Sequence, residues 1–423
     1  MEHFSKTNKN FSKATLLALI KQKKTEEAEK YLQTHFILNK MSPGVFAWEG
    51  YSDEIVEKDK KTFEHMLDGA EFVEYIETKN SVQKVITPCS KWFSRTQTEQ
   101  CMKTMSLTDG RLFKKGGQCY FNHFRGFPLL DKVKDGLPKE CNTGHIRGLC
   151  NRIWEHIRIV WCSGNTSQFE YVKRWLANAV VGNKMNTFLC FQNTPEGCGK
   201  TIILVFLQNR VLSKHICAKV DNGTSSLTGG ENAQFLGKTM IVFEELKAMS
   251  ITDWKNIMTG LNNLITSNSF TYKKLYRDRD EAPNLASVMT FSNHAVYIRG
   301  DNRRACVLDV SPCKVGDFDY FDKLAEATES DLVGQLFFWQ CLQIAKEKFD
   351  ERRIPQTESL IEAKIKGMHK VHKFIKQMYV MERESIDSTA SELLDEYKLY
   401  NSVDSSITPK AFGTKLSEIG MKS

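Results

Sequence analysis

The sequence predicts an α/β protein with a largely parallel sheet at its centre and helical regions on both sides. The first observation is a set of short apolar runs separated by longer polar or helical segments, a pattern typical of buried parallel strands. These runs are residues 187–191, 239–243, 287–291 and 305–310. The second observation is a glycine-containing segment that directly follows the first run and directly precedes an apolar helical pattern.

Length and composition predict a folded protein of several domains. The 423 residues suffice for about two to four domains, and the composition of 41% hydrophobic and 26% charged residues excludes a disordered or collagen-like chain. No apolar stretch approaches the roughly 18 residues of a membrane span. The apolar run at residues 14–20 is flanked by lysines and lacks a small-residue cleavage pattern, so it predicts an amphipathic helix rather than a leader peptide. We expect no membrane partner.

The cysteines and the net charge indicate the redox environment of the protein and the class of its partners. The 12 cysteines form no Cys-x-x-Cys pair, and Cys141 and Cys150 bracket His145 at spacings that do not suit zinc. We therefore expect reduced, structural thiols in an intracellular protein. The 59 basic and 51 acidic residues give a net charge of +8, which permits nucleic-acid binding without requiring it.

Local composition divides the chain into three regions. Residues 1–165 mix lysine-rich helical patterns with strand-like pieces, which predicts an α+β or mainly helical N-terminal region for oligomerisation or partner binding. Residues 166–312 begin with a helix whose apolar positions fall on one face and continue with the strand runs. Residues 313–423 predict a helical region that ends in a pair of helices around Pro409.

The segment between the first strand and the next helix has the residues of a phosphate-binding loop. Gly197 and Gly199 allow backbone N–H groups to surround a β-phosphate, Lys200 reaches the β and γ oxygens, and the Thr201 hydroxyl ligates Mg²⁺. Thr194 stands where the strict pattern has its first glycine. The alternative is a plain loop. The residues predicted to bind ATP are Thr194, Pro195, Glu196, Gly197, Cys198, Gly199, Lys200 and Thr201.

Two adjacent acids follow the second apolar run. Because side chains alternate along a strand, one acid can face a Mg²⁺ ion while the other orients an attacking water. We assign Glu244 to the metal and Glu245 to the water as the catalytic base, and the reverse assignment stays open. The alternative is an exposed acidic strand end.

Polar residues flank the last two strand runs. Asn293 follows residues 287–291, where its amide can hold the lytic water or sense a γ-phosphate. Arg303 and Arg304 precede the run at 305–310. They form either a solvated turn or an arginine finger, which stabilises the transferring phosphoryl group from across a subunit boundary.

With these motifs in this order, the chain resembles the superfamily 3 helicases of viruses and mobile elements, and among them the poxvirus-type and phage-type primase-helicase branch. The similarity spans roughly residues 115–420. It implies a P-loop AAA+ ATPase core, ATP and Mg²⁺ as cofactors, and a homo-hexameric ring. It also makes Asn293 the sensor and Arg303 or Arg304 the trans-acting finger. Further matching segments are residues 121–127, 149–159 and 171–177 before the loop, and 318–324 and 354–357 after it.

The same resemblance implies a β-hairpin that lines the central pore, between the acidic strand and the sensor. The matching stretch is residues 270–277, in which cations suit phosphates and aromatic rings suit stacked bases, at about 1–3 kcal/mol per base. The alternative is an ordinary basic hairpin on the surface. The residues expected to contact nucleic acid are Lys273, Lys274, Tyr276 and Arg277.

Two features depart from the family. The last helices resemble a winged-helix domain, but the chain ends at Ser423, where a wing hairpin would begin. Residues 1–165 contain nothing like the Asp-x-Asp metal pair of a primase, and the Asp-x-Asp pairs at Asp278 and Asp317 lie in polar stretches. We therefore expect no primer synthesis, and a separate primase or an origin-binding protein is a candidate partner.

The expected function is that of an ATP-dependent replicative DNA helicase. The resemblance implies that the ring translocates on single-stranded DNA at a replication fork, in the 3′–5′ direction. An RNA helicase or a genome-packaging ATPase would share the loop and the acids, and a non-enzymatic scaffold is the third alternative. The expected location is inside the host cell, in the cytoplasm or the nucleus, at the site of viral replication.

Overall fold

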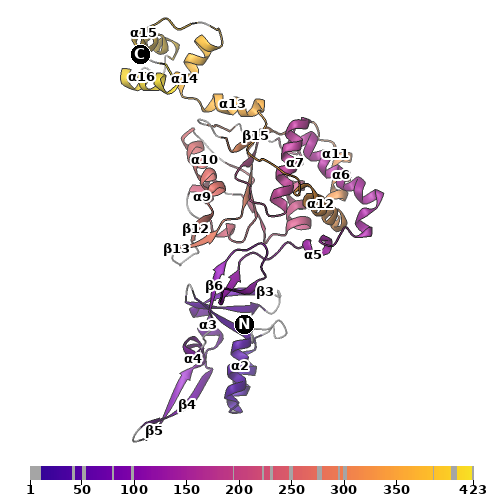
Figure 1. Ribbon diagram of the computed structural model, residues 1–423, viewed down its shortest axis with the longest axis vertical. Coiled ribbons are helices and arrows are strands. Elements are labelled where there is room, and N and C mark those ends of the chain that lie inside the picture. The colour runs from indigo at the N-terminus through magenta and orange to yellow at the C-terminus, as the bar shows by residue number, and fades with distance from the viewer. Residues whose placement is uncertain are drawn as a thin grey trace. The chain divides into compact units, whose positions relative to one another are not determined.

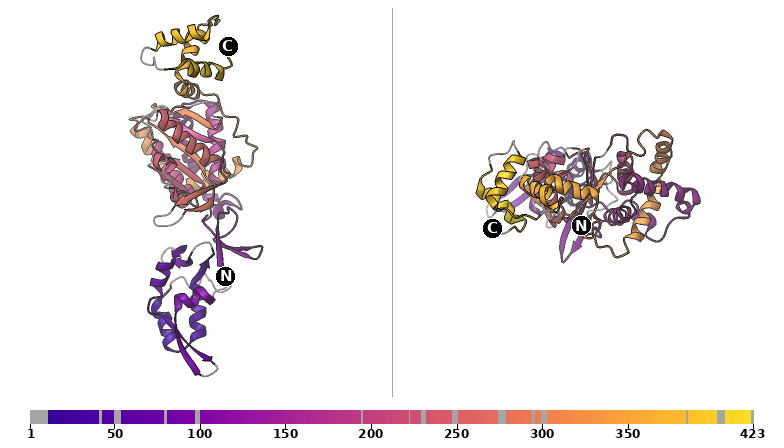
Figure 2. Two further views of the ribbon diagram at one scale, coloured as in Figure 1. Left: turned by 90° about the vertical axis from the view of Figure 1, so that its left-hand side faces the viewer. Right: turned by 90° about the horizontal axis from the view of Figure 1, so that it is seen from above.

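In the part of the chain that it describes, the computed structural model contains α-helices, short 3-10 and π-helical turns and four sheets, drawn from three directions in Figure 1 and Figure 2. Within the residues that it describes, no helix is both long and apolar enough to cross a membrane. The described residues are 11–40, 43–49, 54–78, 81–96, 100–193, 195–221, 223–228, 232–246, 251–273, 279–293, 296–298, 303–383, 385–401 and 407–421.

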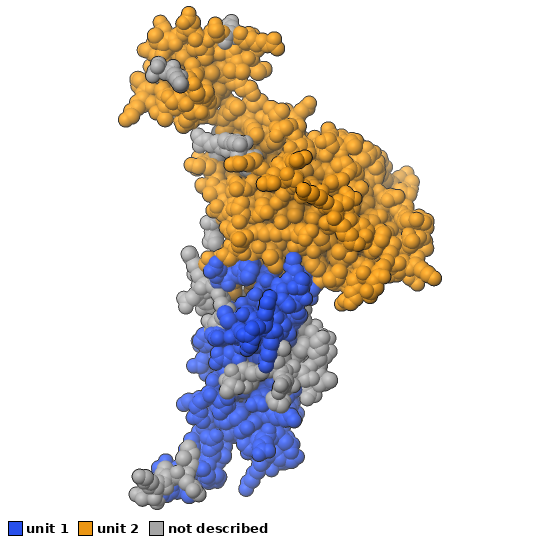
Figure 3. All heavy atoms as spheres, viewed as in Figure 1, with its two compact units in different colours: residues 1–126, 281–283 blue, residues 127–280, 284–423 orange. Residues whose placement is uncertain are grey.

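The chain forms two compact units (Figure 3). One comprises residues 1–126 with 281–283, and the other comprises residues 127–280 and 284–423. The sequence placed the first boundary at residue 165, whereas residues 127–165 lie in the second unit. The reason is that α6 (Gly144–His156) packs against α11 (Phe318–Glu329) and α12 (Asp331–Ile344), which come from far along the chain.

The first unit has an α+β arrangement. Its six-stranded sheet has the order β3-β2-β1-β6-β8-β7, and β4 and β5 form a separate antiparallel hairpin. Side-chain caps begin two of its helices, since Ser12 accepts a hydrogen bond from the Thr15 backbone and Asp59 from the Thr62 backbone. The helices are α1 (Lys13–Lys21), α2 (Thr25–His35), α3 (Lys60–Met66) and α4 (Cys89–Thr96). The strands are β1 (Phe36–Asn39), β2 (Gly44–Glu49), β3 (Glu54–Asp59), β4 (Glu71–Thr78), β5 (Ser81–Pro88), β6 (Gln100–Thr104), β7 (Leu112–Lys115) and β8 (Gln118–Asn122).

One cysteine pair corrects the expectation that all thiols are reduced. Cys101 on β6 and Cys119 on β8 are directly opposite each other in the parallel ladder, and the structure joins them in a disulfide. Their Cα atoms are 4.7 Å apart, so the register of two neighbouring strands places the sulfurs together. The remaining cysteines are free, and of these Cys313 alone is exposed.

The second unit is built on a parallel sheet with the strand order β10-β11-β14-β9-β15. The four apolar runs of the sequence form four of these strands, which confirms the predicted parallel sheet; β10 is an addition. Phe191 on β9 is level with Phe291 on β14 and Leu308 on β15. The strands are β9 (Phe188–Gln192), β10 (Cys217–Val220), β11 (Met240–Phe243), β14 (Ser287–Phe291) and β15 (Ala305–Asp309).

Helices cover both faces of this sheet. Figure 1 shows α9 (Gly223–Thr228) and α10 (Ile251–Thr266) on one side. On the other side lie α6, α11 and α12, together with α7 (Thr166–Val180). Phe188, Ile241 and Val288 are level with one another on three neighbouring strands. On the first side they are buried in one hydrophobic cluster with apolar residues of α10. The sequence therefore folds as a helix–sheet–helix sandwich, because each buried strand needs apolar cover on both faces.

The last part of the second unit is helical. It includes α13 (Glu358–Gly367) and α14 (Lys370–Ile375), which are separate helices because Met368 between them adopts an extended backbone with ψ of 147°. α15 (Ala390–Tyr400) begins with a capping box between Thr389 and Glu392. α16 (Pro409–Glu418) follows, and α14, α15 and α16 share a small core around Phe374, Tyr397 and Phe412. A winged-helix assignment for them stays a prediction.

Candidate functional site

The predicted phosphate loop joins β9 to α8 (Lys200–Phe206), which continues as the π-helical turn η3 (Leu207–Leu212). Its backbone has positive φ at Asn193 (50°), Gly197 (74°) and Gly199 (85°), a conformation that glycine adopts without strain. Gly199 also lacks room for a side chain. A Cβ atom there would lie 2.5 Å from Phe321 Cε1 and 2.7 Å from His156 Cε1. Thr194 lies outside the described residues.

The topology places this loop at the carboxyl edge of the sheet. β9 lies between β14 and β15, so the connections that leave β9 and β14 run to opposite sides. Ligands of open α/β sheets bind at such a switch point, beyond the carboxyl ends of the strands. The loop therefore occupies the position at which this architecture forms a binding site.

Lys200 points toward the end of the neighbouring strand β14. Its ammonium nitrogen lies 5.8 Å from the ring centroid of Phe291, the last residue of β14. The following residue, Ser292, donates its backbone N–H to Phe191 O at 2.8 Å. Asn293 comes next and is exposed. The structure thus brings Lys200 and the residues after β14 to the same edge, with the exposed Thr201 next to Lys200.

Glu244 follows β11, the strand beyond β14, and its two carboxylate oxygens have different surroundings. Oε2 lies 2.7 Å from Lys219 Nζ on β10, and this hydrogen bond raises the pKa of Lys219. Oε1 is buried and has no hydrogen-bond partner within the described part of the chain. Glu245 is half-buried and comes directly after Glu244.

These donors fit Mg²⁺ with a bound nucleotide. Mg²⁺ is commonly held by one or two carboxylates together with phosphate oxygens and water, rather than by an all-protein cage. Among the described residues, no group of three or more His, Cys, Asp or Glu side chains could hold a metal ion. The unpartnered Oε1 of Glu244 and the exposed hydroxyl of Thr201 are the protein oxygens that match the sequence-based assignment.

A buried histidine that sequence reasoning missed lies beneath the loop. His156, the last residue of α6, is fully buried, and its Nδ1 lies 3.0 Å from the Tyr320 hydroxyl on α11. Its Nε2 is buried without a hydrogen-bond partner among the residues described. Burial lowers the pKa of His156 to about 4, and the Gly199 backbone opposes that shift. No local sequence pattern could have found this site, because its members are separated by long stretches of chain.

Asp309 holds the first residue of the loop. Asn193 Nδ2 donates to Asp309 Oδ1 at 2.8 Å, and Ser359 Oγ donates to Asp309 Oδ2 at 2.6 Å. Ser163 Oγ donates to the backbone oxygen of the same aspartate at 2.7 Å. The end of β15 therefore fixes the start of the loop, which accounts for the positive φ of Asn193.

Arg303 and Arg304 lie at the opposite edge of the sheet. They directly precede β15, and the backbone oxygen of Arg304 accepts a hydrogen bond from Phe188 N, the first residue of β9, at 2.9 Å. Both arginines are exposed. The five residues of β9 span about 15 Å, so the structure does not bring these arginines to the loop of their own chain.

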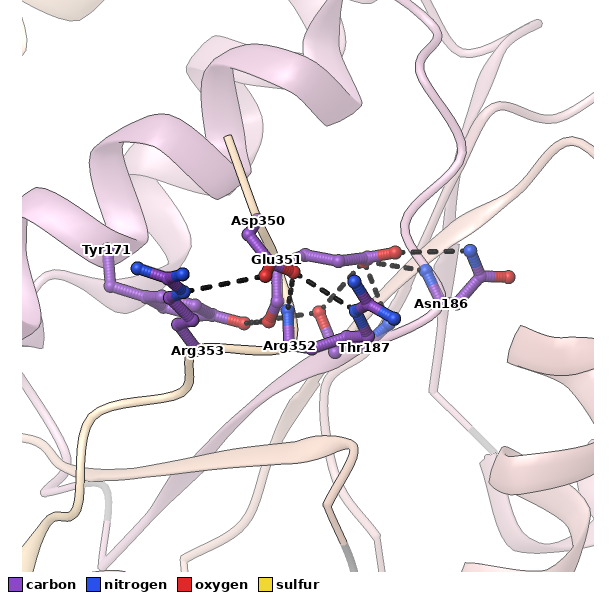
Figure 4. Close-up of polar contacts among 7 residues, drawn as sticks. All are labelled: Tyr171, Asn186, Thr187, Asp350, Glu351, Arg352 and Arg353. Atoms are coloured by element: carbon purple, nitrogen blue, oxygen red, sulfur yellow. Dashed lines mark hydrogen bonds and ion pairs between the residues drawn. The ribbon is translucent and has the colours of Figure 1, made fainter. Parts of the chain in front are cut away.

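A second polar cluster fixes the beginning of β9 (Figure 4). Glu351 Oε2 accepts hydrogen bonds from Asn186 N at 2.7 Å and from Thr187 N at 3.1 Å. Tyr171 donates its hydroxyl to the Glu351 backbone oxygen at 2.7 Å. This cluster ties the segment after α12 to the strand that carries the loop.

The predicted pore hairpin corresponds to two short strands. β12 (Ser269–Lys273) and β13 (Arg279–Pro283) form a two-stranded sheet, so the connection between them coincides with the predicted basic segment. Lys274, Tyr276 and Arg277 lie outside the described residues, as does the side chain of Lys273. Their contact with nucleic acid stays a prediction.

Comparisons with known proteins add a fold relationship. A family model described as "Family of unknown function (DUF5906)" matches residues 191–304, from β9 to Arg304. No curated protein matches the chain. The apo structure of the C-terminal region of NrS-1 has a TM-score of 0.56 and 14% identity, over 85% of this chain and 82% of that one. A structure of the JCV helicase has a TM-score of 0.31 and 15% identity, over 52% of this chain and 64% of that one.

The similarity to NrS-1 extends over most of both chains. It shows that the two chains share a fold, which in this chain is mixed α/β with a parallel sheet. The chain thus has a mixed α/β fold with a parallel sheet, and a strand-to-helix loop lies at the carboxyl edge of that sheet.

Proposed function

We propose that the chain is an ATP-driven replicative DNA helicase of a virus or mobile element. The observation that carries the proposal is the position of Lys200, Asn293 and Glu244. They follow three adjacent strands, β9, β14 and β11, and so share one edge of the sheet. A cation for phosphates, an amide for a water and a carboxylate for a metal are the groups that phosphoryl transfer requires.

The proposed chemistry divides among these side chains. Backbone N–H groups of residues 196–200 and the Lys200 ammonium bind the phosphates, while Thr201 and Glu244 hold Mg²⁺. When bound, Mg²⁺ neutralises charge that develops on the phosphate oxygens. Glu245 accepts a proton from the water that attacks the γ-phosphate, and Asn293 orients that water. The roles of Glu244 and Glu245 are distinguishable, because loss of the base leaves Mg²⁺–nucleotide binding intact.

The proposed assembly is a hexameric ring in which Arg303 or Arg304 acts on the nucleotide of a neighbouring subunit. Both arginines are exposed and stand a strand length away from their own loop, which supports a role in trans. Alanine at the operative arginine is expected to abolish turnover and retain ATP binding. Mixing this variant with Lys200→Ala protein is expected to restore some activity at hybrid interfaces. Normal turnover by both single variants and by the double variant would remove the trans finger from the proposal.

The β12–β13 hairpin is the proposed contact with single-stranded DNA. Replacing Lys273, Lys274 and Arg277 by alanine is expected to weaken DNA binding and to flatten its salt dependence. Each lost phosphate contact removes about 0.7 from the slope of log affinity against log salt. An unchanged slope would place the DNA path elsewhere on the ring.

The deciding experiment is ATP hydrolysis without nucleic acid and with single-stranded DNA, double-stranded DNA or RNA, with Lys200→Ala as the inactive control. Stimulation by DNA that is lost in the control supports the helicase and leads to unwinding assays that define the polarity, proposed as 3′–5′. Stimulation by RNA alone favours an RNA motor, and turnover that requires double-stranded DNA favours a packaging ATPase. A protein that binds no ATP contradicts the proposal. The proposed motor acts inside the host cell, with a separate primase or an origin-binding protein as the proposed partner.

A further inference from the structure

The contact between His156 and the phosphate loop has features that core packing alone does not explain. His156 is fully buried at the end of α6, and its ring lies against the backbone of Gly199. A Cβ atom added to Gly199 would lie 3.1 Å from His156 Nε2, so this nitrogen is close to the Gly199 backbone. Nε2 nevertheless makes no hydrogen bond within the described residues. A buried polar atom without a partner is destabilising by about 1–3 kcal/mol, so its position beside the loop indicates a use.

Two neighbours define which ring nitrogen carries the proton. The Tyr320 hydroxyl lies 3.0 Å from Nδ1, and a tyrosine O–H is able either to donate to this nitrogen or to accept from it; we take it as the donor. With Nδ1 accepting this bond, a neutral imidazole carries its hydrogen on Nε2. The Gly199 backbone acts to raise the pKa of His156, as a carbonyl oxygen facing a ring N–H does. Nε2–H is therefore a buried donor that faces the Gly199 peptide.

The geometry of the peptide bond connects this donor to the nucleotide. The Gly199 carbonyl and the Lys200 N–H belong to one trans peptide and point in opposite directions. When the carbonyl turns toward His156, the Lys200 N–H turns away from the histidine. That N–H belongs to the first residue of α8, where backbone donors bind phosphate.

We propose that His156 is a positioning residue for nucleotide binding, whose Nε2–H donates to the Gly199 carbonyl in the bound state and thereby directs the Lys200 N–H at the phosphates. Tyr320 fixes the histidine tautomer. The inference rests on the proposed function, since it assumes that this loop holds a nucleoside triphosphate. It adds α6 and α11 to the parts of the chain that determine nucleotide affinity.

Two substitutions at position 156 separate positioning from packing. His156→Leu fills the space without a donor, and His156→Gln retains an amide N–H at a similar reach. ATP affinity, measured by calorimetry, is expected to fall about tenfold in His156→Leu and to stay within about threefold in His156→Gln. In turnover assays of His156→Leu, the KM for ATP is expected to rise, with kcat nearly unchanged. Trp161→Phe is the matched control, because it removes another buried unpartnered N–H close to His156 in the chain, and it is expected to leave ATP affinity unchanged.

Equal losses in His156→Leu and His156→Gln would overturn the inference, because they would indicate a steric role. Normal ATP affinity in a folded His156→Leu would overturn it as well. If His156→Leu does not fold, Tyr320→Phe provides the second variant. Its ATP affinity is expected to fall about threefold, and an unchanged ATP affinity would overturn the inference.

A measurement on the unaltered chain tests the tautomer directly. In ¹⁵N-histidine NMR spectra, the hydrogen is expected on Nε2 of His156, with a shift of that nitrogen on addition of ADP. A hydrogen on Nδ1 would overturn the inference while leaving the proposed function intact. The absence of any nucleotide binding by the unaltered chain would instead refute the proposed function, and this inference with it.

Discussion

Lys219 and Glu244 form an ion pair between adjacent strands of the parallel sheet, with 2.7 Å between Nζ and Oε2. The lysine side chain is 37% exposed and the glutamate side chain 15% exposed, so the pair is only partly shielded from solvent. Since Lys219 occupies Oε2, Oε1 is the carboxylate oxygen that remains for a metal or a water. The lysine cation therefore opposes the binding of a second cation at Glu244.

Removal of this cation is expected to increase the affinity of the site for Mg²⁺. In Lys219→Met, the Mg²⁺ concentration at half-maximal ATP turnover is expected to fall two- to fivefold, since a partly exposed ion pair contributes about 0.5–1 kcal/mol. Lys219→Arg retains the charge and serves as the control. An unchanged Mg²⁺ requirement in Lys219→Met would show that Glu244 does not hold the metal.

The two loop glycines are expected to differ in their tolerance of alanine. Gly199→Ala combines a φ of +85° with a Cβ that would lie 2.5 Å from Phe321, whereas the nearest atom to a Cβ at Gly197 is 3.8 Å away. We expect Gly199→Ala to destabilise the protein by about 3 kcal/mol or more and Gly197→Ala by about 1–2 kcal/mol. Urea unfolding of both variants measures the difference, and equal losses would contradict the tight packing at Gly199.

Acid is expected to destabilise the protein through His156. The pKa of His156 is lowered to about 4 in the folded chain, against about 6.5 when unfolded, so between these values the unfolded chain binds more protons. The free energy of unfolding therefore falls as the pH drops from 6.5 to 4, by about 3 kcal/mol from this group. His156→Gln lacks the titration, so the difference between the two unfolding curves isolates it. A difference that does not vary with pH would contradict the prediction.

Glu351 is expected to be important for stability although it lies outside the candidate site. Glu351→Ala removes the acceptor for the backbone N–H groups of Asn186 and Thr187, which should lower the free energy of unfolding by about 2–4 kcal/mol. Glu347→Ala, which breaks an exposed ion pair with Arg174 of 3.2 Å, is the control and should cost less than about 1 kcal/mol. Denaturant unfolding compares the two, and similar losses would refute the proposed role of the cluster.

The parts of the fold that local patterns encode could be predicted from the sequence. The apolar runs form buried parallel strands because a continuous run suits a strand covered on both faces. The glycines of the loop have the predicted backbone freedom, with positive φ at Gly197 and Gly199. β10 was not predicted, because it is four residues long and its third residue, Lys219, interrupts the apolar pattern.

Long-range contacts could not be predicted in this way. The six-stranded sheet of the first unit pairs β1 with β6, which lie far apart in the chain, and the Cys101–Cys119 disulfide follows from strand register. The contact of His156 with Gly199 joins the end of α6 to a loop beyond α7. Such contacts depend on how the elements pack, and a single sequence contains no local signal for them.

Arg304 is separated from Lys200 by the length of β9, so ATP turnover per chain is expected to depend on protein concentration. Under the proposed trans arrangement, a lone subunit holds only half of a hydrolytic centre, so the rate per chain must rise with protein concentration until rings are complete. At dilutions where rings dissociate, each chain would retain its nucleotide without hydrolysing it. The sheet itself would then restrict ATP consumption to the assembled motor, and a rate per chain that is constant over all dilutions would contradict this.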